Sequence, residues 1–218
     1  MNNAKYVVFD GMDGSGKGAQ IALLRKLGDR VVFTREPGGT PFAEEIRKLV
    51  LDNPLAGESA VLNSFLLFWA SREEAMQKVV VPTLQAGKHV FSDRGDSSTY
   101  AFQLHGEERM ELLDLFSRLR AMVFSGQDGR RQPDLYVIFD LPAEVARERV
   151  LQDSERTKNH FDVRDIGYYE RVRHGFHRFS EFQPAVIIDA TRTPEEIHRD
   201  VMLALAAKMI IPELAFVA

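Results

Sequence analysis

The sequence contains no cysteine among its 218 residues. That absence excludes disulfide frameworks, thiolate metal sites and cysteine nucleophiles together. Long apolar runs are also missing, because the most apolar stretch, 203–218, is interrupted by Lys208, Pro212 and Glu213. A membrane-spanning helix needs about 20 apolar residues in succession. The first residues do not combine a basic region with a following apolar run, so we expect no signal peptide and a cytoplasmic protein.

An excess of positive charge is absent as well. The chain has 28 Lys and Arg residues against 32 Asp and Glu residues, which gives a formal net charge of −4. Broad binding to nucleic acid or to an anionic membrane requires a basic surface, so we expect neither partner. A site for an anionic small molecule remains possible, because it needs only a few well-placed cations. The length and the ordinary content of 44% hydrophobic residues predict one domain over residues 1–218.

Strand and helix patterns alternate along the chain. Short apolar runs predict strands at residues 5–10, 30–34, 89–91, 135–139 and 185–188. Helical spacing of apolar residues predicts helices at 19–27, 41–51, 59–85 with an interruption near Pro82, 96–104, 107–124, 142–152, 166–179 and 194–209. The strand runs are continuously apolar rather than alternating. This pattern indicates an α/β fold with a parallel sheet covered on both faces.

The first predicted strand leads directly into a glycine-rich loop, residues 11–18. Gly11, Gly16 and Lys17 have the spacing of a Walker A loop, in which backbone amides surround phosphate oxygens and the lysine reaches the β and γ phosphates. We therefore predict an ATP site formed by Gly11, Asp13, Gly14, Ser15, Gly16, Lys17, Gly18 and Ala19.

The metal-binding hydroxyl of this loop is missing. Gly18 stands where a Ser or Thr usually contacts Mg²⁺. Mg²⁺ commonly keeps several of its waters. We therefore expect Asp93 to hold the ion through water, with Asp10 as a second candidate.

Arg35 and Arg94 each come at the end of a predicted strand, so both side chains should lie at the carboxyl edge of the sheet, where open α/β sheets bind ligands. A phosphoryl acceptor that is itself a phosphate needs cations to bring two anions together. One such arginine alone would more often form a surface ion pair. Two of them at equivalent strand ends favour phosphate binding.

With the following motifs, the chain resembles the thymidylate kinase family, whose P-loop enzymes move the γ-phosphoryl group of ATP onto dTMP. The matching segments are the loop itself and residues 34–40 (TREPGGT), 66–72 (LLFWASR), 92–94 (SDR), 98–103 and 132–135 (QPDL). They occur in the family order between about residues 6 and 200. The resemblance implies a P-loop NTPase-type three-layer α/β/α fold with a five-stranded parallel sheet and a short helical lid at about residues 150–163. It also implies ATP and dTMP as ligands, Mg²⁺ as cofactor and a homodimer.

The resemblance further implies roles for residues around the acceptor phosphate. Arg35 and Arg94 would hold the dTMP phosphate, and Asp13 would accept a hydrogen bond from the sugar 3′-hydroxyl. Lys17, Asp93 and Arg94 would act on the transferring group. From the residues alone, Asp13 could instead brace its own loop, and Asp93 could form a simple ion pair with a neighbouring cation.

For the nucleoside, the resemblance implies that Phe68 stacks on thymine and that Arg72, at i+4 on the same helix face, donates to the base carbonyls. Ser98 and Thr99 would contact the base edge, and Phe102 would crowd the sugar 2′ position against ribonucleotides. Without the resemblance, both phenylalanines would be assigned to the hydrophobic core.

The lid differs from the family pattern. Arg156 is the expected catalytic cation of the lid, with Lys158 beside it, but on composition alone the segment could be a solvated loop. His160 stands where the family commonly has an arginine, and Arg147 and Arg149 on the preceding helix are further candidate cations. With Gly18, the His160 departure leaves an alternative function open, a nucleotide-binding protein with weak or lost transfer. A kinase for a 5-modified dUMP is another alternative.

Overall fold

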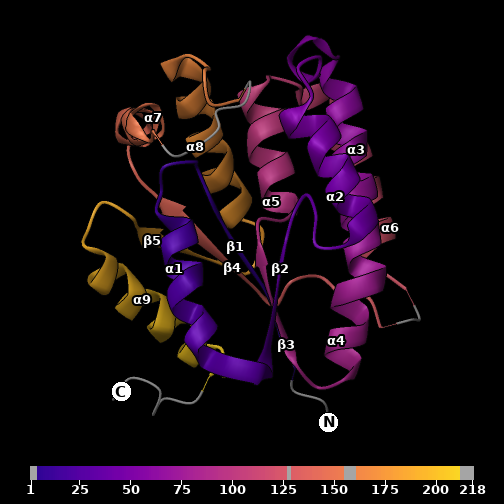
Figure 1. The fold of residues 1–218 in the computed structure, drawn as a ribbon, viewed down its shortest axis with the longest axis vertical. Coiled ribbons are helices and arrows are strands. Elements are labelled where there is room, and N and C mark those ends of the chain that lie inside the picture. The colour runs from indigo at the N-terminus through magenta and orange to yellow at the C-terminus, as the bar shows by residue number, and fades with distance from the viewer. Residues whose placement is uncertain (1–3, 127–128, 155–160, 212–218) are drawn as a thin grey trace.

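The computed structural model describes residues 4–126, 129–154 and 161–211. These residues form a parallel five-stranded sheet in the order β2-β3-β1-β4-β5 (Figure 1). The strands are β1 (Tyr6–Gly11), β2 (Val31–Arg35), β3 (His89–Asp93), β4 (Leu135–Asp140) and β5 (Ala185–Asp189). All the predicted strands are confirmed, with ends that differ by one or two residues.

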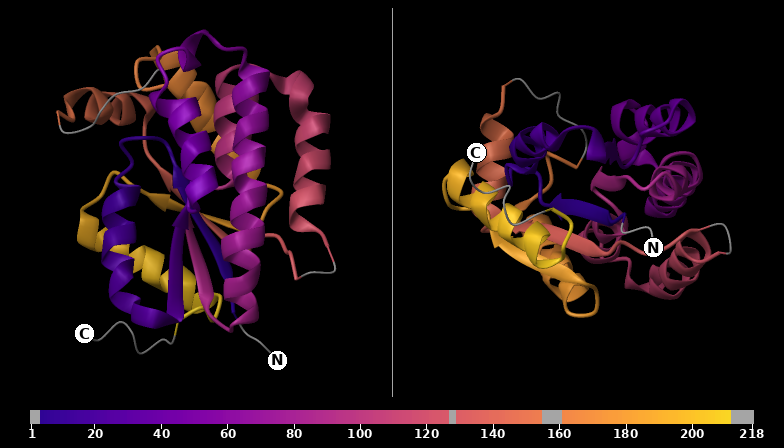
Figure 2. Two further views of the ribbon diagram at one scale, coloured as in Figure 1. Left: turned by 45° about the vertical axis from the view of Figure 1, so that its right-hand side comes forward. Right: turned by 90° about the horizontal axis from the view of Figure 1, so that it is seen from below.

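Helices cover both faces of the sheet (Figures 1 and 2). On one face, α1 (Lys17–Leu24) packs beside α9 (Pro194–Ala207). The other face carries α3 (Val61–Ala75), α4 (Val81–Gln85), α5 (Asp96–Ser98) and α8 (Ile166–Ser180). The remaining helices of the described residues are α2 (Pro41–Arg47), α6 (Leu113–Phe124) and α7 (Ala143–Gln152). The predicted three-layer α/β/α architecture is therefore confirmed.

Local sequence signals set several helix starts. Thr40 caps α2 by accepting a hydrogen bond from the backbone N–H of Ala43, and Pro41 follows at the first helical position. Thr193 and Glu196 form a capping box at the start of α9. Because β1, β2 and β3 are parallel, the β1–α1, β2–α2 and β3–α5 connections all lie at the carboxyl edge of the sheet.

The helical segments are less regular than the sequence pattern predicts. The predicted helix 59–85 changes to a π-helical turn at Met76–Val80, one turn before Pro82. Proline has no N–H to offer the carbonyl four residues earlier, which explains a change of register on that side. The predicted helix start at residue 107 is wrong. Glu108 has a φ of 54°, a left-handed conformation that no helix interior accepts, so α6 begins only at Leu113 after a short 3-10 turn.

Other helices end earlier than predicted. The α-helical part of the predicted helix 41–51 ends at Arg47 and continues as a π-helical turn over Lys48–Asp52. A further π-helical segment, η5 (Thr99–Gly106), extends α5, and a 3-10 segment, η1 (Arg25–Arg30), follows α1. The last helix ends at Ala207 rather than at residue 209.

The core lies on both faces of the central strands. All six residues of β1 are buried, and large aromatic side chains such as Phe9, Phe91 and Phe139 fill the space beside it. A central parallel strand enclosed in this way fixes the position of the loop that follows it. No helix in the described ranges is long and apolar enough to cross a membrane.

Candidate active site

A cavity of about 490 Å³ lies at the carboxyl ends of β1, β2 and β3. Its lining brings together residues from distant parts of the chain: Met12–Gly18, Arg35–Pro37, Arg47, Leu51, Asp52, Phe68, Arg72, Asp93–Gly95, Ser98, Thr99, Phe102, Gln103 and Phe161. Most of the residues predicted from the sequence are in this list. Gly11, Asp10 and Ala19 lie outside it, with Ala19 exposed on α1.

The glycine-rich loop has the backbone shape that phosphate binding requires. Gly14 and Gly16 both have positive φ values, of 81° and 76°. A Cβ on Gly14 would lie 2.5 Å from the carbonyl oxygen of Ala146, so only glycine fits there. The loop then enters α1 at Lys17, with the helix N-terminus facing the cavity. The buried hydroxyl of Ser15 has no hydrogen-bond partner among the described residues, as expected of a group that awaits a ligand.

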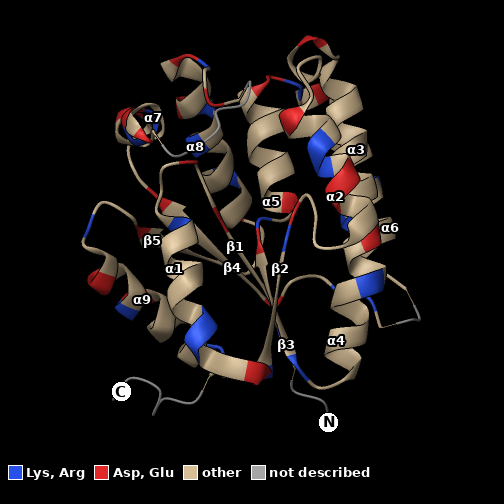
Figure 3. Cartoon of the chain, viewed as in Figure 1, with Lys and Arg blue, Asp and Glu red and all other residues tan. Residues whose placement is uncertain are grey.

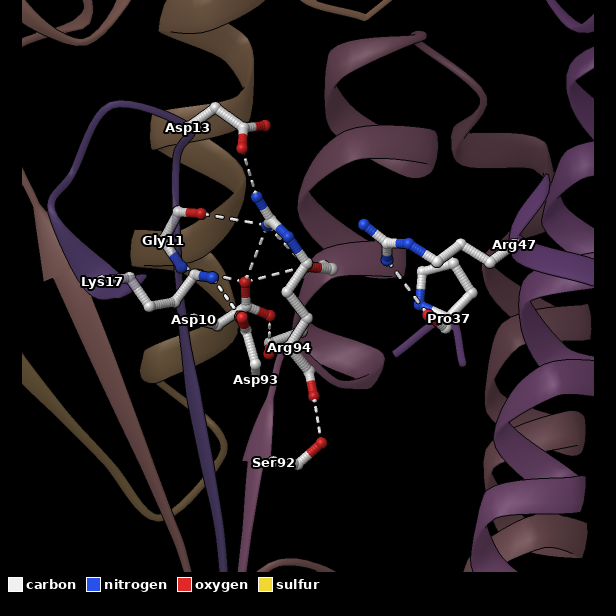
Figure 4. Close-up of polar contacts among 11 residues, drawn as sticks. Asp10, Gly11, Asp13, Lys17, Pro37, Arg47, Ser92, Asp93 and Arg94 are labelled. Atoms are coloured by element: carbon white, nitrogen blue, oxygen red, sulfur yellow. Dashed lines mark hydrogen bonds and ion pairs between the residues drawn. The ribbon is translucent and has the colours of Figure 1, made fainter. Parts of the chain in front are cut away.

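Lys17 forms an ion pair with Asp93 across the cavity floor (Figure 4). The side chain of Lys17 is largely buried, whereas that of Asp93 is 33% exposed. Burial acts to raise the pKa of Asp93, but the charges of Lys17 and Arg94 outweigh it and leave the pKa below its usual value. Asp93 is therefore an ionised carboxylate that both holds the lysine and faces the cavity.

Arg94 is the centre of the polar cluster drawn in Figure 4. Its Nη2 donates to Asp13 at 2.8 Å, and its Nη1 donates to Asp10 and to the carbonyl of Gly11, each at 3.1 Å. Burial acts to lower the pKa of Arg94, but the carboxylates of Asp13, Asp10 and Asp93 reverse that effect and raise it. Arg94 also has a φ of 71°, an unusual conformation for a residue with a side chain. Strain of this kind persists where the surroundings enforce it, as at ligand sites.

Asp10, the second candidate for holding Mg²⁺, lies outside the cavity lining as a buried carboxylate. Its carboxylate is fully buried and accepts hydrogen bonds from the backbone of Gly11, from Arg94 and from the hydroxyls of Ser97 and Ser98. With both oxygens used in this way, the geometry does not support Asp10 as a metal ligand. Its contacts instead anchor Arg94 and the start of α5 to β1.

Arg35 and Arg47 enter the cavity from the next strand and helix. Arg35 is paired with Glu44, at 2.8 Å between Nη2 and Oε2. Arg47, which the sequence pattern did not indicate, donates from Nη1 to the carbonyl of Pro37 at 3.1 Å (Figure 4). No carboxylate of the described residues lies within ion-pair distance of Arg47. Burial, followed by the charge of Arg35, lowers the pKa of Arg47. An anion bound in the cavity would favour the charged guanidinium and so oppose both effects on the pKa of Arg47.

Arg72 and Phe68 line the other end of the cavity. Arg72 is almost fully buried, with Nε donating to Glu36 at 2.7 Å and Nη2 donating to Thr99 at 3.1 Å. Its Nη1 is buried without a partner in the described ranges, although it is a charged donor. Phe68 is only partly buried and faces the cavity rather than the core. An aromatic face beside a fixed unpaired donor suits a planar ligand with a carbonyl edge.

Ser98 and Phe102 line the cavity between the Arg94 cluster and the end formed by Arg72 and Phe68. The Ser98 hydroxyl lies 3.1 Å from Arg94 Nη1, and the Phe102 ring lies under the Arg94 guanidinium, 5.1 Å from its Cζ. Phe102 also packs edge-to-face against Phe176 of α8. The ring is therefore held in place at the cavity wall instead of filling the core.

The balance of charged residues in the cavity lining differs from that of the whole chain. In Figure 3, Lys and Arg segments alternate with Asp and Glu segments along the helices. The cavity is lined by five cations, Lys17, Arg35, Arg47, Arg72 and Arg94, and by four carboxylates, those of Asp13, Glu36, Asp52 and Asp93. The cavity lining therefore carries a small excess of positive residues, whereas the whole chain has a formal net charge of −4.

The predicted lid cations Arg156 and Lys158, and His160 at the position where the family commonly has an arginine, lie outside the described residues. Phe161, just after them, lines the cavity. The two candidates on α7 do not line it. Arg149 donates from Nη1 to the carbonyls of Gly14 and Ala190, and Arg147 donates to the carbonyl of Arg164. Arg149 therefore braces the glycine-rich loop from behind.

Glu36 gives the site a pH-dependent component. Burial raises its pKa from 4.5 to about 7, although Arg72 opposes the shift. A carboxyl whose pKa is raised on folding contributes stability below its unfolded pKa and loses that contribution as the pH rises through the folded value. We therefore expect the melting temperature of the wild type to fall relative to that of Glu36→Gln between pH 4.5 and pH 7. Thermal melts of both proteins across this range measure it, and parallel curves would contradict it.

Comparison with known proteins places this geometry among kinases. The model of the thymidylate kinase family matches residues 9–201 of the chain. The thymidylate kinase of Chlorobaculum parvum is 35% identical over 220 aligned residues, covering 95% of this chain and 97% of the relative. That of Chromobacterium violaceum is 36% identical over 212 residues, covering 94% and 95%.

A solved structure agrees with the sequence matches. The crystal structure of thymidylate kinase from Ehrlichia chaffeensis superimposes with a TM-score of 0.71 at 29% identity. The superposition covers 93% of this chain and 98% of that one. The likeness thus extends over the whole sheet and its surrounding helices.

Proposed function

Because the chain belongs to the thymidylate kinase family, we propose that it transfers the γ-phosphoryl group of ATP to dTMP, forming ADP and dTDP. The observation that carries this proposal is one cavity that joins a P-loop to a separate set of arginines and to the partly buried ring of Phe68. A phosphate oxygen of dTMP attacks the γ-phosphorus as the bond to the bridging oxygen of ADP breaks. The acceptor oxygen is already anionic, so no general base is required.

The donor half of the site is the glycine-rich loop. The backbone amides of residues 13–18 and the N-terminus of α1 surround the β and γ phosphates of ATP. Lys17 exchanges its contact with Asp93 for these more highly charged oxygens, and the free hydroxyl of Ser15 donates to a phosphate oxygen. Phosphoryl transfer depends mainly on such positioning and on electrostatic stabilisation.

The acceptor half is the arginine group. Arg35, Arg47 and Arg94 hold the dTMP phosphate, since forked guanidinium donors match phosphate oxygens. Asp13 accepts from the sugar 3′-hydroxyl. Thymine stacks on Phe68, and the unpaired Nη1 of Arg72 donates to a base carbonyl. An amino group at that position of the base would leave the buried donor facing another donor, which disfavours cytosine.

The residues present supply only part of the usual set of Mg²⁺ ligands. Asp93 presents an ionised, partly exposed carboxylate in the cavity, while Gly18 offers no hydroxyl. Asp93 would therefore hold the ion through its water, as first expected. When bound, the ion neutralises charge that develops between the β and γ phosphates.

Phe102 should control sugar selectivity. We expect Phe102→Ala to lower the preference for dTMP over its ribonucleotide by about 10-fold, because the ring no longer crowds the 2′ position. The measurement is kcat/KM for both nucleotides in variant and wild type. Phe33→Ala, which removes a ring packed on Phe91 away from the cavity, is the control. An unchanged ratio in Phe102→Ala would assign the ring to packing alone.

We also propose the homodimer implied by the family. Its support is a group of exposed apolar side chains on the adjacent helices α3 and α6, namely Leu62, Leu66, Leu113 and Met122. Light scattering at micromolar concentration measures the mass, and a value near 24.7 kDa would mean a monomer. The cytoplasmic location stays a prediction.

The enzymatic proposal is tested by turnover of a panel of nucleotides with ATP and Mg²⁺. We expect dTMP to be converted faster than dCMP, dGMP or AMP, with 5-modified dUMP analogues included in the panel. Turnover no faster with dTMP than with the purine nucleotides would reject the substrate assignment. Binding of dTMP without any turnover would instead favour a nucleotide-binding protein.

A further inference from the structure

Glu44 of α2 lies outside the cavity lining, yet it accepts both side-chain hydrogen bonds that Arg35 makes within the described residues. Its Oε2 accepts from Arg35 Nη2 at 2.8 Å, and its Oε1 accepts from Arg35 Nε at 3.2 Å. This two-point contact occupies one edge of the guanidinium. Arg35 Nη1 has no hydrogen bond or ion pair within the part of the chain that the structure describes. The pairing therefore leaves a free donor edge on an arginine that lines the cavity.

The loop between β2 and α2 is built around this carboxylate. Oε1 of Glu44 also accepts from the backbone N–H of Gly39 at 2.9 Å. A Cβ on Gly38 would lie 2.4 Å from the same oxygen and 3.3 Å from Arg35 Nε. The Gly38 N–H in turn donates to Ser71, next to Arg72 on α3. One carboxylate thus fixes the arginine and the loop that joins it to the opposite wall of the cavity.

We propose that Glu44 is a positioning residue for the acceptor phosphate, which aims Arg35 at the phosphate by holding the opposite edge of its guanidinium. The inference rests on the proposed function, because it assumes that Arg35 binds the dTMP phosphate. Hydrogen bonding to Glu44 raises the pKa of Arg35, and the same bond lowers the pKa of Glu44, so both groups stay charged through the neutral range.

The direction in which dTMP binding changes when Glu44 is replaced distinguishes a positioning role from a purely electrostatic one. A carboxylate beside an anion site repels the ligand, so removal of its charge alone should tighten dTMP binding. Binding should also tighten if Glu44 only competes with the dTMP phosphate for Arg35 and has to be displaced by it. A positioning role predicts the reverse, because a freed arginine at the cavity rim loses its alignment.

The test compares Glu44→Gln with Glu45→Gln. Glu45 is the neighbouring glutamate, which is exposed and paired with Lys48, so both variants remove the same charge from the same helix. In Glu44→Gln, an amide NH₂ meets donors of Arg35 or Gly39 whichever way it turns. Glu44→Asp keeps the charge but is too short to make both contacts. The assays measure KM for dTMP and for ATP, the Ki of thymidine, kcat and the melting temperature.

We expect KM for dTMP to rise about 10-fold in Glu44→Gln and in Glu44→Asp. KM for ATP and the Ki of thymidine, which has no phosphate, should stay within about two-fold of wild type, as should every value for Glu45→Gln. A lower or unchanged KM for dTMP in Glu44→Gln overturns the proposal, whatever the melting temperature does. A wild type that fails to phosphorylate dTMP would instead contradict the proposed function.

Discussion

Replacing Arg94 by alanine is expected to lower kcat/KM for dTMP by about 10³-fold. The guanidinium donates to the carboxylate of Asp13 and to the loop carbonyl of Gly11, so in the proposed function it lies next to both the acceptor phosphate and the donor loop. Preorganised cations at such a point account for losses of about this size in other phosphoryl-transfer enzymes.

The effect of Arg94→Ala on activity has to be separated from its effect on stability, because Arg94 also pairs with Asp10. A strand-end arginine would be expected to matter little for folding, but here it is the cation next to a fully buried carboxylate. Arg94→Ala should therefore also destabilise the protein. Arg94→Lys keeps the charge and loses the fork, so we expect a smaller loss of stability with most of the loss of activity retained. Arg118→Ala, which removes an exposed surface arginine, should leave both unchanged. Activity near wild type in Arg94→Lys would contradict a forked contact with phosphate.

Replacing Lys17 by alanine is expected to lower kcat by about 10³-fold, because Lys17 is the one cation within the glycine-rich loop, residues 11–18. KM for dTMP should change little, since Lys17 belongs to the donor half of the cavity. Steady-state kinetics with each nucleotide varied in turn measure both quantities.

The matched control for this variant is Lys48→Ala, which removes an exposed lysine paired with Glu45. Turnover that persists in Lys17→Ala would mean that the loop does not deliver phosphate. A rise in KM for dTMP as large as the fall in kcat would place Lys17 in the acceptor half instead.

Much of the fold could be predicted from the sequence because its signals are local. The strands are short continuous apolar runs, and the loop after β1 has fixed spacing of Gly and Lys. The helix ends were less predictable. The π-helical turn lies just before Pro82, and the left-handed Glu108 interrupts the next predicted helix; the spacing of apolar residues indicates neither change.

The site was predictable where residues follow strands or match a motif, as with Lys17, Arg35 and Arg94. Arg47 was missed because it lies inside a helix, one face of which contains ordinary surface charges. Glu36 and Glu44 were missed for a similar reason, since their importance comes from the arginine that each one contacts. Asp10 looked like a metal ligand beside a P-loop, and only its enclosure by hydroxyls and Arg94 reveals a different place.

The most direct test of the whole account is a crystal structure with dTMP and a non-hydrolysable ATP analogue bound. We expect thymine against the ring of Phe68 with a carbonyl at Arg72 Nη1, and the acceptor phosphate on Arg35 and Arg94. The donor phosphates should lie in the loop of residues 11–18. A base bound elsewhere, or an acceptor phosphate away from both arginines, would contradict the assignment of this cavity as the site of phosphoryl transfer.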